Sequence, residues 1–181
     1  MTCTVEVPVI LRQMDYKKDA SYDADVVIVG TGAGGAVVGA RLAEAGWDVL
    51  FVEEGGYFPT SSFNPYIGES INRMYRDAGA TVILGTPPIP YAEGRCVGGS
   101  TVLNGGMTWR TPVRIHDTWE REIGPELGYK AFESLYEEVE GVVHAKSQIP
   151  QSVGDDNRIM VQGAKKMGWK VDINHRNQDS C

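Results

Sequence analysis

The sequence predicts an α/β fold with a parallel sheet, and three observations lead to this prediction. Residues 25–29 and 48–52 each form an apolar run behind an aspartate, as strands buried on both faces of a parallel sheet do. Residues 34–45 place apolar side chains on one helical face, and a glycine follows them as a stop signal. A Gly-x-Gly-x-x-Gly pattern at residues 30–35 joins the first strand to this helix. Together these segments form a Rossmann-like β-α-β unit of about 30 residues.

The elements outside this unit are predicted from composition and periodicity. Residues 1–22 alternate weakly and then become polar, so we expect an N-terminal arm ahead of the main fold. Residues 57–90 are rich in Pro, Ser, Asn and Gly, and such a long irregular segment is more often functional than not. The further elements that we expect are a helix over residues 67–77, a strand over residues 81–84 and helices over residues 131–144 and 156–167.

Charge and composition limit the classes of partner. The chain has 181 residues, a net charge of −7 and 22 glycines, which favours a small ligand bound close to the backbone over nucleic acid or an anionic membrane. Its three cysteines fit neither a disulfide framework nor a zinc site, which indicates a reducing compartment. No export signal and no run of about 20 apolar residues is present, so we expect a cytoplasmic protein without a transmembrane segment.

The first glycine loop has the chemistry of a dinucleotide site. Gly30 allows the tight turn after the strand, Gly32 lets the backbone meet a pyrophosphate, and Gly35 allows the helix and strand to pack closely. Glu53 stands at the end of the second strand, where a carboxylate binds the hydroxyls of a ribose. Glu54 beside it fits a role in binding and a side chain that faces water equally well. A purely structural turn is the alternative for the glycines.

Residues 94–107 form a second loop rich in glycine, Gly94-Arg-Cys-Val-Gly-Gly-Ser-Thr-Val-Leu-Asn-Gly-Gly-Met107. Consecutive backbone N–H groups in such a loop can form a concave anion site. Two glycine loops suit a flavin cofactor, because the second can stabilise the charge that reduction places on the ring. A bare NAD domain has no need of the second loop. Composition alone leaves a glycine-rich surface loop as the alternative.

Four motifs resemble the N-terminal part of the glucose–methanol–choline (GMC) oxidoreductases. They are residues 27–35, 52–56, 94–106 and 117–120, and they occur in that family's order. Residues 163–168 and 176–181 resemble, more weakly, the bacterial branch related to long-chain alcohol oxidases and gluconate-type dehydrogenases. The resemblance implies that residues 23–181 are the N-terminal part of an FAD-binding domain, with the substrate domain absent.

The resemblance also implies the residues that would hold FAD. Gly30, Gly32, Ala33, Gly34 and Gly35 would meet the pyrophosphate, and Glu53 the adenosine ribose. The second loop would supply Gly98, Gly99, Ser100, Asn104, Gly105, Met107 and Thr108 along the flavin and ribityl chain. Some members attach FAD covalently through a histidine before the signature asparagine, but Leu103 stands there in this chain, so we expect noncovalent binding. Between Asn104 and Trp109 this chain is one residue longer than some members of the family. The motif positions that correspond to Met107 and Thr108 therefore shift by up to one residue.

The family oxidises CH–OH groups of small-molecule alcohols by hydride transfer to the flavin, with a histidine base near the C-terminus. That region has no counterpart here, so the isolated chain is expected to be inactive, and its substrate and electron acceptor are not encoded in it.

The three histidines show no catalytic or metal-binding spacing; they are His144, His175 and His116, which precedes a predicted helix cap at Asp117. Cys96 is expected to be a packing residue. Two other functions stay open: a noncatalytic nucleotide-binding or interaction module, and a small NAD-dependent reductase.

Overall fold

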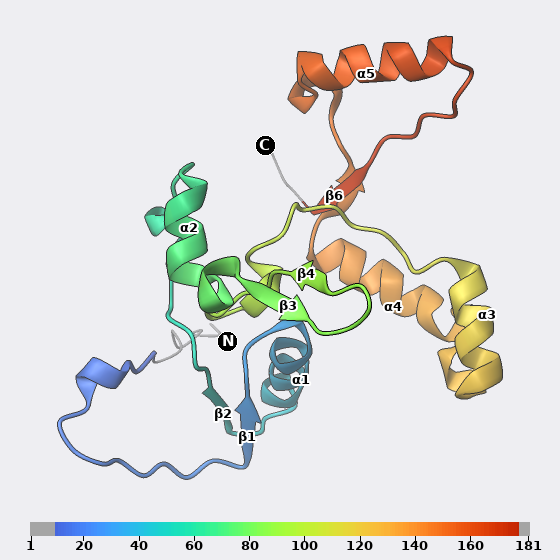
Figure 1. The fold of residues 1–181 in the computed structure, drawn as a ribbon. Helices are drawn as coiled ribbons and strands as arrows, with labels where there is room; N and C mark the ends of the chain where they lie inside the picture. Colours follow the sequence, from blue (N-terminus) through green and yellow to red (C-terminus); the bar gives the residue numbers. More distant parts are fainter. Residues whose placement is uncertain (1–9, 178–181) are drawn as a thin grey trace, which may run out of the picture. The chain divides into compact units, whose positions relative to one another are not determined.

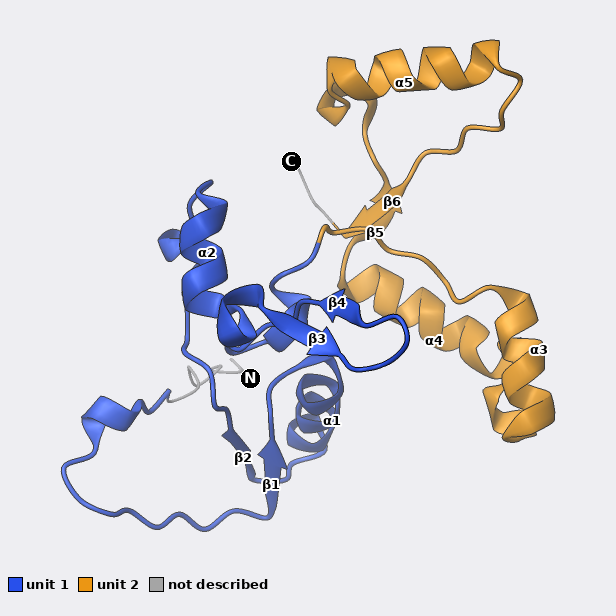
Figure 2. Cartoon of the chain, in the orientation of Figure 1, with its two compact units in different colours: residues 1–104 blue, residues 105–181 orange. Residues whose placement is uncertain are grey.

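The structure is a computed structural model that describes residues 10–177 and divides into two compact units (Figure 2). Unit 1 ends at Asn104 and unit 2 begins at Gly105. Residues 1–9 of the expected arm and residues 178–181, which end the weaker family motif, lie outside the described residues. From residue 10 onward the arm contains one 3-10 turn, Gln13–Asp15. The division into an arm and a domain over residues 23–181 stays a prediction.

Unit 1 is built on the expected β-α-β unit (Figure 1). Strand β1 (Val26–Val29) pairs in parallel with β2 (Val49–Val52), and α1 (Ala33–Glu44) connects them. A methyl group added to Gly35 would lie 3.2 Å from Cγ2 of Ile28, and one added to Gly39 would overlap the ring of Phe51. Helix α1 therefore packs directly on one face of the two strands. The α/β class and the parallel sheet are confirmed.

The sequence predicted strands buried on both faces, and this is wrong for the described residues. Val27 is 56% exposed, Val29 85% and Val52 51%. Because neighbouring residues of a parallel pair in register share a face, all three lie on the side opposite α1. Within the described part of unit 1, α1 is the element that packs on these strands, so the apolar pattern of a two-sided strand meets one helical layer there.

The irregular segment after β2 contains one α-helix and one hairpin. Helix α2 covers Ile67–Met74, and β3 (Thr81–Ile83) pairs antiparallel with β4 (Ile89–Tyr91). The predicted helix over residues 67–77 ends earlier, at Met74, because Tyr75 is extended and bridges Gly94. The predicted strand over residues 81–84 is confirmed as β3.

The second glycine loop enters unit 1 beside β2. Cys96 forms a parallel bridge with Gly56, and the N–H of Val97 donates to the carbonyl of Gly56 at 3.0 Å. On the other side the N–H of Arg95 donates to the carbonyl of Met74 at 2.7 Å. Cys96 is 1% exposed and Met74 5%, so the most buried apolar side chains of the unit hold the base of this loop.

The described residues of unit 2 form three α-helices and one hairpin. These are α3 (Val113–Glu122), α4 (Tyr129–Val142), β5 (Ala145–Ser147), α5 (Asp155–Lys166) and β6 (His175–Asn177), with β5 and β6 antiparallel. The expected helices over residues 131–144 and 156–167 correspond to α4 and α5. The expected cap at Asp117 is wrong, because α3 begins four residues earlier, directly after Pro112, whose fixed φ suits a helix start. None of the described helices is long and apolar enough to cross a membrane.

Candidate functional site

A cavity of about 510 Å³ lies in unit 1 at the carboxyl ends of β1 and β2. It is lined by the first glycine loop, by the end of β2 and by the second glycine loop. Among the residues predicted to bind a cofactor, the lining contains Gly30, Gly32, Ala33, Glu53, Gly99 and Ser100. Gly34, Gly35, Gly98 and Asn104 belong to the same two loops but not to the lining. Crevices at this end of parallel strands are where α/β folds bind ligands.

The first loop leaves the start of α1 open. Gly30 has φ +86, which only glycine adopts readily, and Gly32 caps the helix without any side-chain hydrogen bond. The first turn of α1 contains no acidic residue. A methyl group added to Gly30, Gly32 or Gly34 would meet nothing within 4 Å. The N–H groups of the first helical turn have no intrahelical partner, and the glycine backbone beside them is uncrowded, which suits the binding of phosphate.

Gly35 is glycine for a different reason. A methyl group there would lie 2.1 Å from the carbonyl oxygen of Gly30, which is a backbone atom and cannot swing away. Gly35 therefore sets how closely α1 approaches the end of β1. This agrees with the sequence interpretation of the third glycine as a packing residue.

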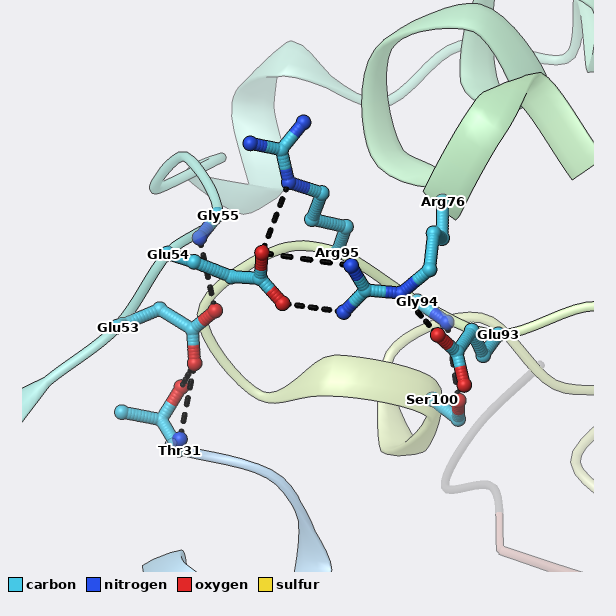
Figure 3. Close-up of polar contacts among 9 residues, drawn as sticks. All are labelled: Thr31, Glu53, Glu54, Gly55, Arg76, Glu93, Gly94, Arg95 and Ser100. Atoms are coloured by element: carbon cyan, nitrogen blue, oxygen red, sulfur yellow. Dashed lines mark hydrogen bonds and ion pairs between the residues drawn. The ribbon is translucent and has the colours of Figure 1, made fainter. Parts of the chain in front are cut away.

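The carboxylate of Glu53 is held by three hydrogen bonds (Figure 3). Its Oε2 accepts from the N–H of Thr31 at 2.9 Å and from the hydroxyl of Thr31 at 2.7 Å, and its Oε1 accepts from the N–H of Gly55 at 2.8 Å. Partial burial acts to raise the pKa of Glu53, but these bonds outweigh it, so the pKa is lowered from its ordinary value of 4.5. Glu53 is therefore a fixed anion in the cavity wall, with an acceptor site remaining on Oε1.

Sequence reasoning missed Thr31. Its hydroxyl donates to Glu53 and accepts from the N–H of Gly98 at 2.9 Å, so one side chain connects both strand ends with the second loop. The signal that could have found it is its position. Val29 and Val52 are paired in register, so a hydroxyl two residues after Val29 lies beside a carboxylate one residue after Val52.

The second loop folds back on itself and lies against the first. Gly98 and Gly99 have φ values of +92 and +55, and a methyl group on Gly99 would lie 3.3 Å from Cα of Gly32. A methyl group on Gly94 would lie 2.5 Å from the backbone of Gly99. The hydroxyl of Ser100 accepts from the N–H of Gly94 at 3.0 Å (Figure 3). The two glycine loops therefore meet backbone to backbone at the cavity.

Two of the three carboxylates in the cavity wall, Glu54 and Glu93, are paired with arginine. The guanidinium of Arg76 pairs with Glu54 and Glu93, and Nε of Arg95 lies 3.3 Å from Glu54 (Figure 3). Hydrogen bonds to Glu54 and Glu93 raise the pKa of Arg76, and the hydrogen bond from Arg76 lowers the pKa of Glu54. Glu54, which the sequence left open, is thus an ion-pair partner. The positive charges here are paired, so backbone N–H groups are left to receive an anion.

Three of the predicted cofactor residues belong to unit 2. The carbonyl of Gly105 accepts from Nη2 of Arg176 at 3.2 Å, and the N–H of Thr108 donates to the carbonyl of His175 at 3.0 Å. Met107 is 62% exposed. Thr108 lines a second cavity of about 800 Å³, beside the Arg110–Glu140 ion pair. Their cofactor role stays a prediction.

The histidines do not form a site. His144 follows α4 with φ +55, and His175 lies in β6. Across residues 10–177 no group of three His, Cys, Asp or Glu side chains could hold a metal ion. Cys96 is buried within the second loop, and burial, followed by the charge of Glu53, raises the pKa of its thiol. This is the environment of an inert packing cysteine.

His116 is fully buried in unit 2 and has a structural environment. Its Nδ1 lies 2.8 Å from the carbonyl of Leu127, which can only accept, so Nδ1 carries the proton. Its Nε2 lies 2.8 Å from the hydroxyl of Tyr136. The rings of Trp119, Tyr129, Phe132 and Tyr136 surround it. Nδ1 therefore joins α3 to the 3-10 turn Pro125–Leu127, and Nε2 joins α3 to α4.

Replacing His116 by phenylalanine should keep the ring but leave the Leu127 carbonyl and the Tyr136 hydroxyl without this partner. We expect a loss of about 1–3 kcal/mol in the free energy of unfolding. Alanine, which also removes the packing, should cost about 3–5 kcal/mol. Urea unfolding followed by tryptophan fluorescence measures both. An alanine variant that unfolds at the wild-type urea concentration would contradict the structural role.

Comparison with known proteins identifies the family. The GMC oxidoreductase model matches residues 71–181. An uncharacterised GMC-type oxidoreductase, y4nJ of Sinorhizobium fredii, is 39% identical over 160 residues, which is 88% of this chain and 32% of that protein. Long-chain-alcohol oxidase FAO4A of Arabidopsis thaliana is 31% identical over 160 residues, 86% of this chain and 21% of the oxidase.

A third relative is the Drosophila melanogaster protein named glucose dehydrogenase [FAD, quinone]. It is 30% identical over 145 residues, 70% of this chain and 22% of the dehydrogenase. The chain thus spans about a third or less of the length of these relatives. Since the family model covers more than half of the sequence, including the whole second glycine loop, the chain belongs to the GMC oxidoreductases.

Proposed function

We propose that this chain forms the ADP-binding part of an FAD-dependent oxidoreductase that acts on CH–OH groups of small alcohols. The observation that carries the proposal is the cavity of unit 1, in which two glycine loops and the fixed carboxylate of Glu53 converge. Family membership supports a flavin rather than NAD. The cavity also fits the group, because the open backbone of Gly30 and Gly32 leaves room that any larger side chain would fill.

Each part of the cofactor has a proposed partner. The N–H groups at the start of α1 would receive the pyrophosphate, and Oε1 of Glu53 would accept a ribose hydroxyl. The second loop, from Gly98 to Gly105, would lie along the flavin, followed by Met107 and Thr108. Leu103 replaces the histidine that tethers the cofactor in some members, so attachment would be noncovalent.

The reaction is proposed from the family and from the names of relatives. When bound, the flavin supplies the acceptor for the hydride of an alcohol. The relatives include proteins named long-chain-alcohol oxidases and one named glucose dehydrogenase [FAD, quinone], which supports an alcohol as substrate and FAD as cofactor. His116 is used structurally and His144 and His175 form no site, so we propose that residues 1–181 alone do not oxidise alcohols. The cytoplasmic localisation stays a prediction.

Titration of the purified chain with FAD tests the cofactor. We expect a yellow complex, release of all the flavin by acid, and a rise in unfolding free energy of about 2.7 kcal/mol when free FAD is 100-fold above its Kd. ADP should compete with FAD, because it fills only the proposed nucleotide half. A chain that FAD neither colours nor stabilises would overturn the proposal. Alcohol-dependent flavin reduction by this chain alone would overturn the claim of inactivity.

A further inference from the structure

We propose that Thr31 is a positioning residue that couples the ribose-binding carboxylate to the second glycine loop. This inference rests on the proposed function, since it concerns the same nucleotide site. Nucleotide bound at Glu53 would thereby also fix the backbone of Gly98–Thr101. The two halves of the cavity would then act as one binding element, although 66 residues separate Thr31 from Gly98 in sequence.

The hydrogen bonds run in one direction through Thr31. The N–H of Gly98 donates to the Thr31 hydroxyl at 2.9 Å, and that hydroxyl donates to Oε2 of Glu53 at 2.7 Å. A hydroxyl has one proton, so committing it to Glu53 leaves only oxygen lone pairs for Gly98. Because the final acceptor is ionised, each bond in the chain polarises and strengthens the next. The order of the second loop therefore depends on the charge and position of Glu53.

The geometry assigns the two carboxylate oxygens different tasks. Oε2 receives both Thr31 bonds, whereas Oε1 receives a single bond, from Gly55. With Oε2 held, the carboxylate cannot rotate. The lone pair of Oε1 that remains free to accept a hydrogen bond therefore has a fixed orientation. The Cys96–Gly56 bridge holds the base of the second loop, and the bond from the N–H of Gly98 to Thr31 attaches its glycine turn to the first loop.

Thr31→Val and Thr31→Ser are the matched test. Valine keeps the shape and removes the hydroxyl, and serine keeps the hydroxyl. We expect Thr31→Val to weaken ADP binding by about tenfold, the cost of one hydrogen bond to a charged acceptor, and Thr31→Ser to bind close to wild type. Isothermal titration calorimetry measures the affinity of both variants for ADP. Equal affinity of wild type and Thr31→Val would overturn the proposal.

Amide hydrogen exchange separates coupling from a merely structural role. In the wild type, ADP should slow exchange over residues 98–101; in Thr31→Val that protection should be lost, and exchange at Gly98 should be faster even without ligand. The acid limb of the ADP affinity should also move to higher pH in Thr31→Val and return in Thr31→Ser. An unchanged Gly98 exchange rate without ligand, or unchanged ADP protection, would refute the coupling.

A second variant and a ligand-free measurement keep the test decisive if Thr31→Val does not fold or if no nucleotide binds. If Thr31→Val does not fold, as judged by circular dichroism, Thr31→Ala removes the hydroxyl without adding any group that could clash, and the same outcomes apply. If the wild-type chain binds neither ADP nor FAD, the proposed function fails by itself. In that case the exchange rate of the Gly98 amide in the ligand-free variants still decides whether Thr31 holds the loop.

Discussion

Replacing Gly35 by alanine is expected to destabilise the chain by about 3 kcal/mol or more and to abolish nucleotide binding. The added methyl group would lie 2.1 Å from the carbonyl oxygen of Gly30 and 3.2 Å from its carbonyl carbon. Both atoms are backbone, so α1 must move away from β1, and the first helical turn leaves the cavity. Urea unfolding and titration with ADP measure the two effects.

Gly34→Ala is the matched control on the neighbouring residue. A methyl group on Gly34 would meet nothing within 4 Å, and the residue lies inside α1. Alanine favours helix over glycine by about 1 kcal/mol, so this variant should unfold at the wild-type urea concentration or above it. If both variants were equally unstable, crowding against Gly30 would not be the cause. A stable Gly35→Ala chain that binds ADP normally would show that the loop can rearrange.

Replacing Glu53 by glutamine is expected to weaken ADP binding by about 10–100-fold. The carboxylate accepts hydrogen bonds on both oxygens, two from Thr31 and one from Gly55. A glutamine side chain has one acceptor oxygen, so in either orientation its NH₂ group faces a backbone N–H and one donor is left without a partner. The loss should appear in calorimetry as a weaker affinity for ADP.

A matched carboxylate and a pH profile accompany this experiment. Glu44 makes an exposed ion pair with Arg41, so Glu44→Gln should change the unfolding free energy by less than about 1 kcal/mol and leave ADP binding unchanged. The pKa of Glu53 is lowered in the fold, so its stabilising contribution is complete above its ordinary pKa of 4.5 and is lost as pH falls through the folded value. Wild-type affinity for ADP should therefore fall in acid. The glutamine variant should lack this pH dependence, and a variant that retains it would assign it to another group.

The β-α-β unit could be predicted because its signals are local. Alternation, apolar runs and the spacing of glycines act over a few residues, and the structure places β1, α1 and β2 within one or two residues of the predicted bounds. The start of α3 could not be placed in the same way. Its helical spacing is weak around Asp117, and the decisive signal is the proline at position 112.

Such local patterns do not identify side-chain partners that are far apart in sequence. Glu54 was equally consistent with solvent, and only the return of the chain at Arg76 and Arg95 gives it two cations. His116 offered no spacing to suggest a role, and its burial depends on the packing of α4 across it.

The sequence by itself determined the α/β class, the two glycine loops, the family and Glu53 as the residue after the second strand. These depend on backbone conformation and on residue spacing, which neighbouring residues largely dictate. Only the tertiary structure decided that the two loops meet at Gly32 and Gly99, and that Thr31 joins Glu53 to Gly98. A hydrogen bond needs its donor and acceptor within about 3 Å, and strand pairing together with the fold of the intervening 66 residues brings these atoms to that distance.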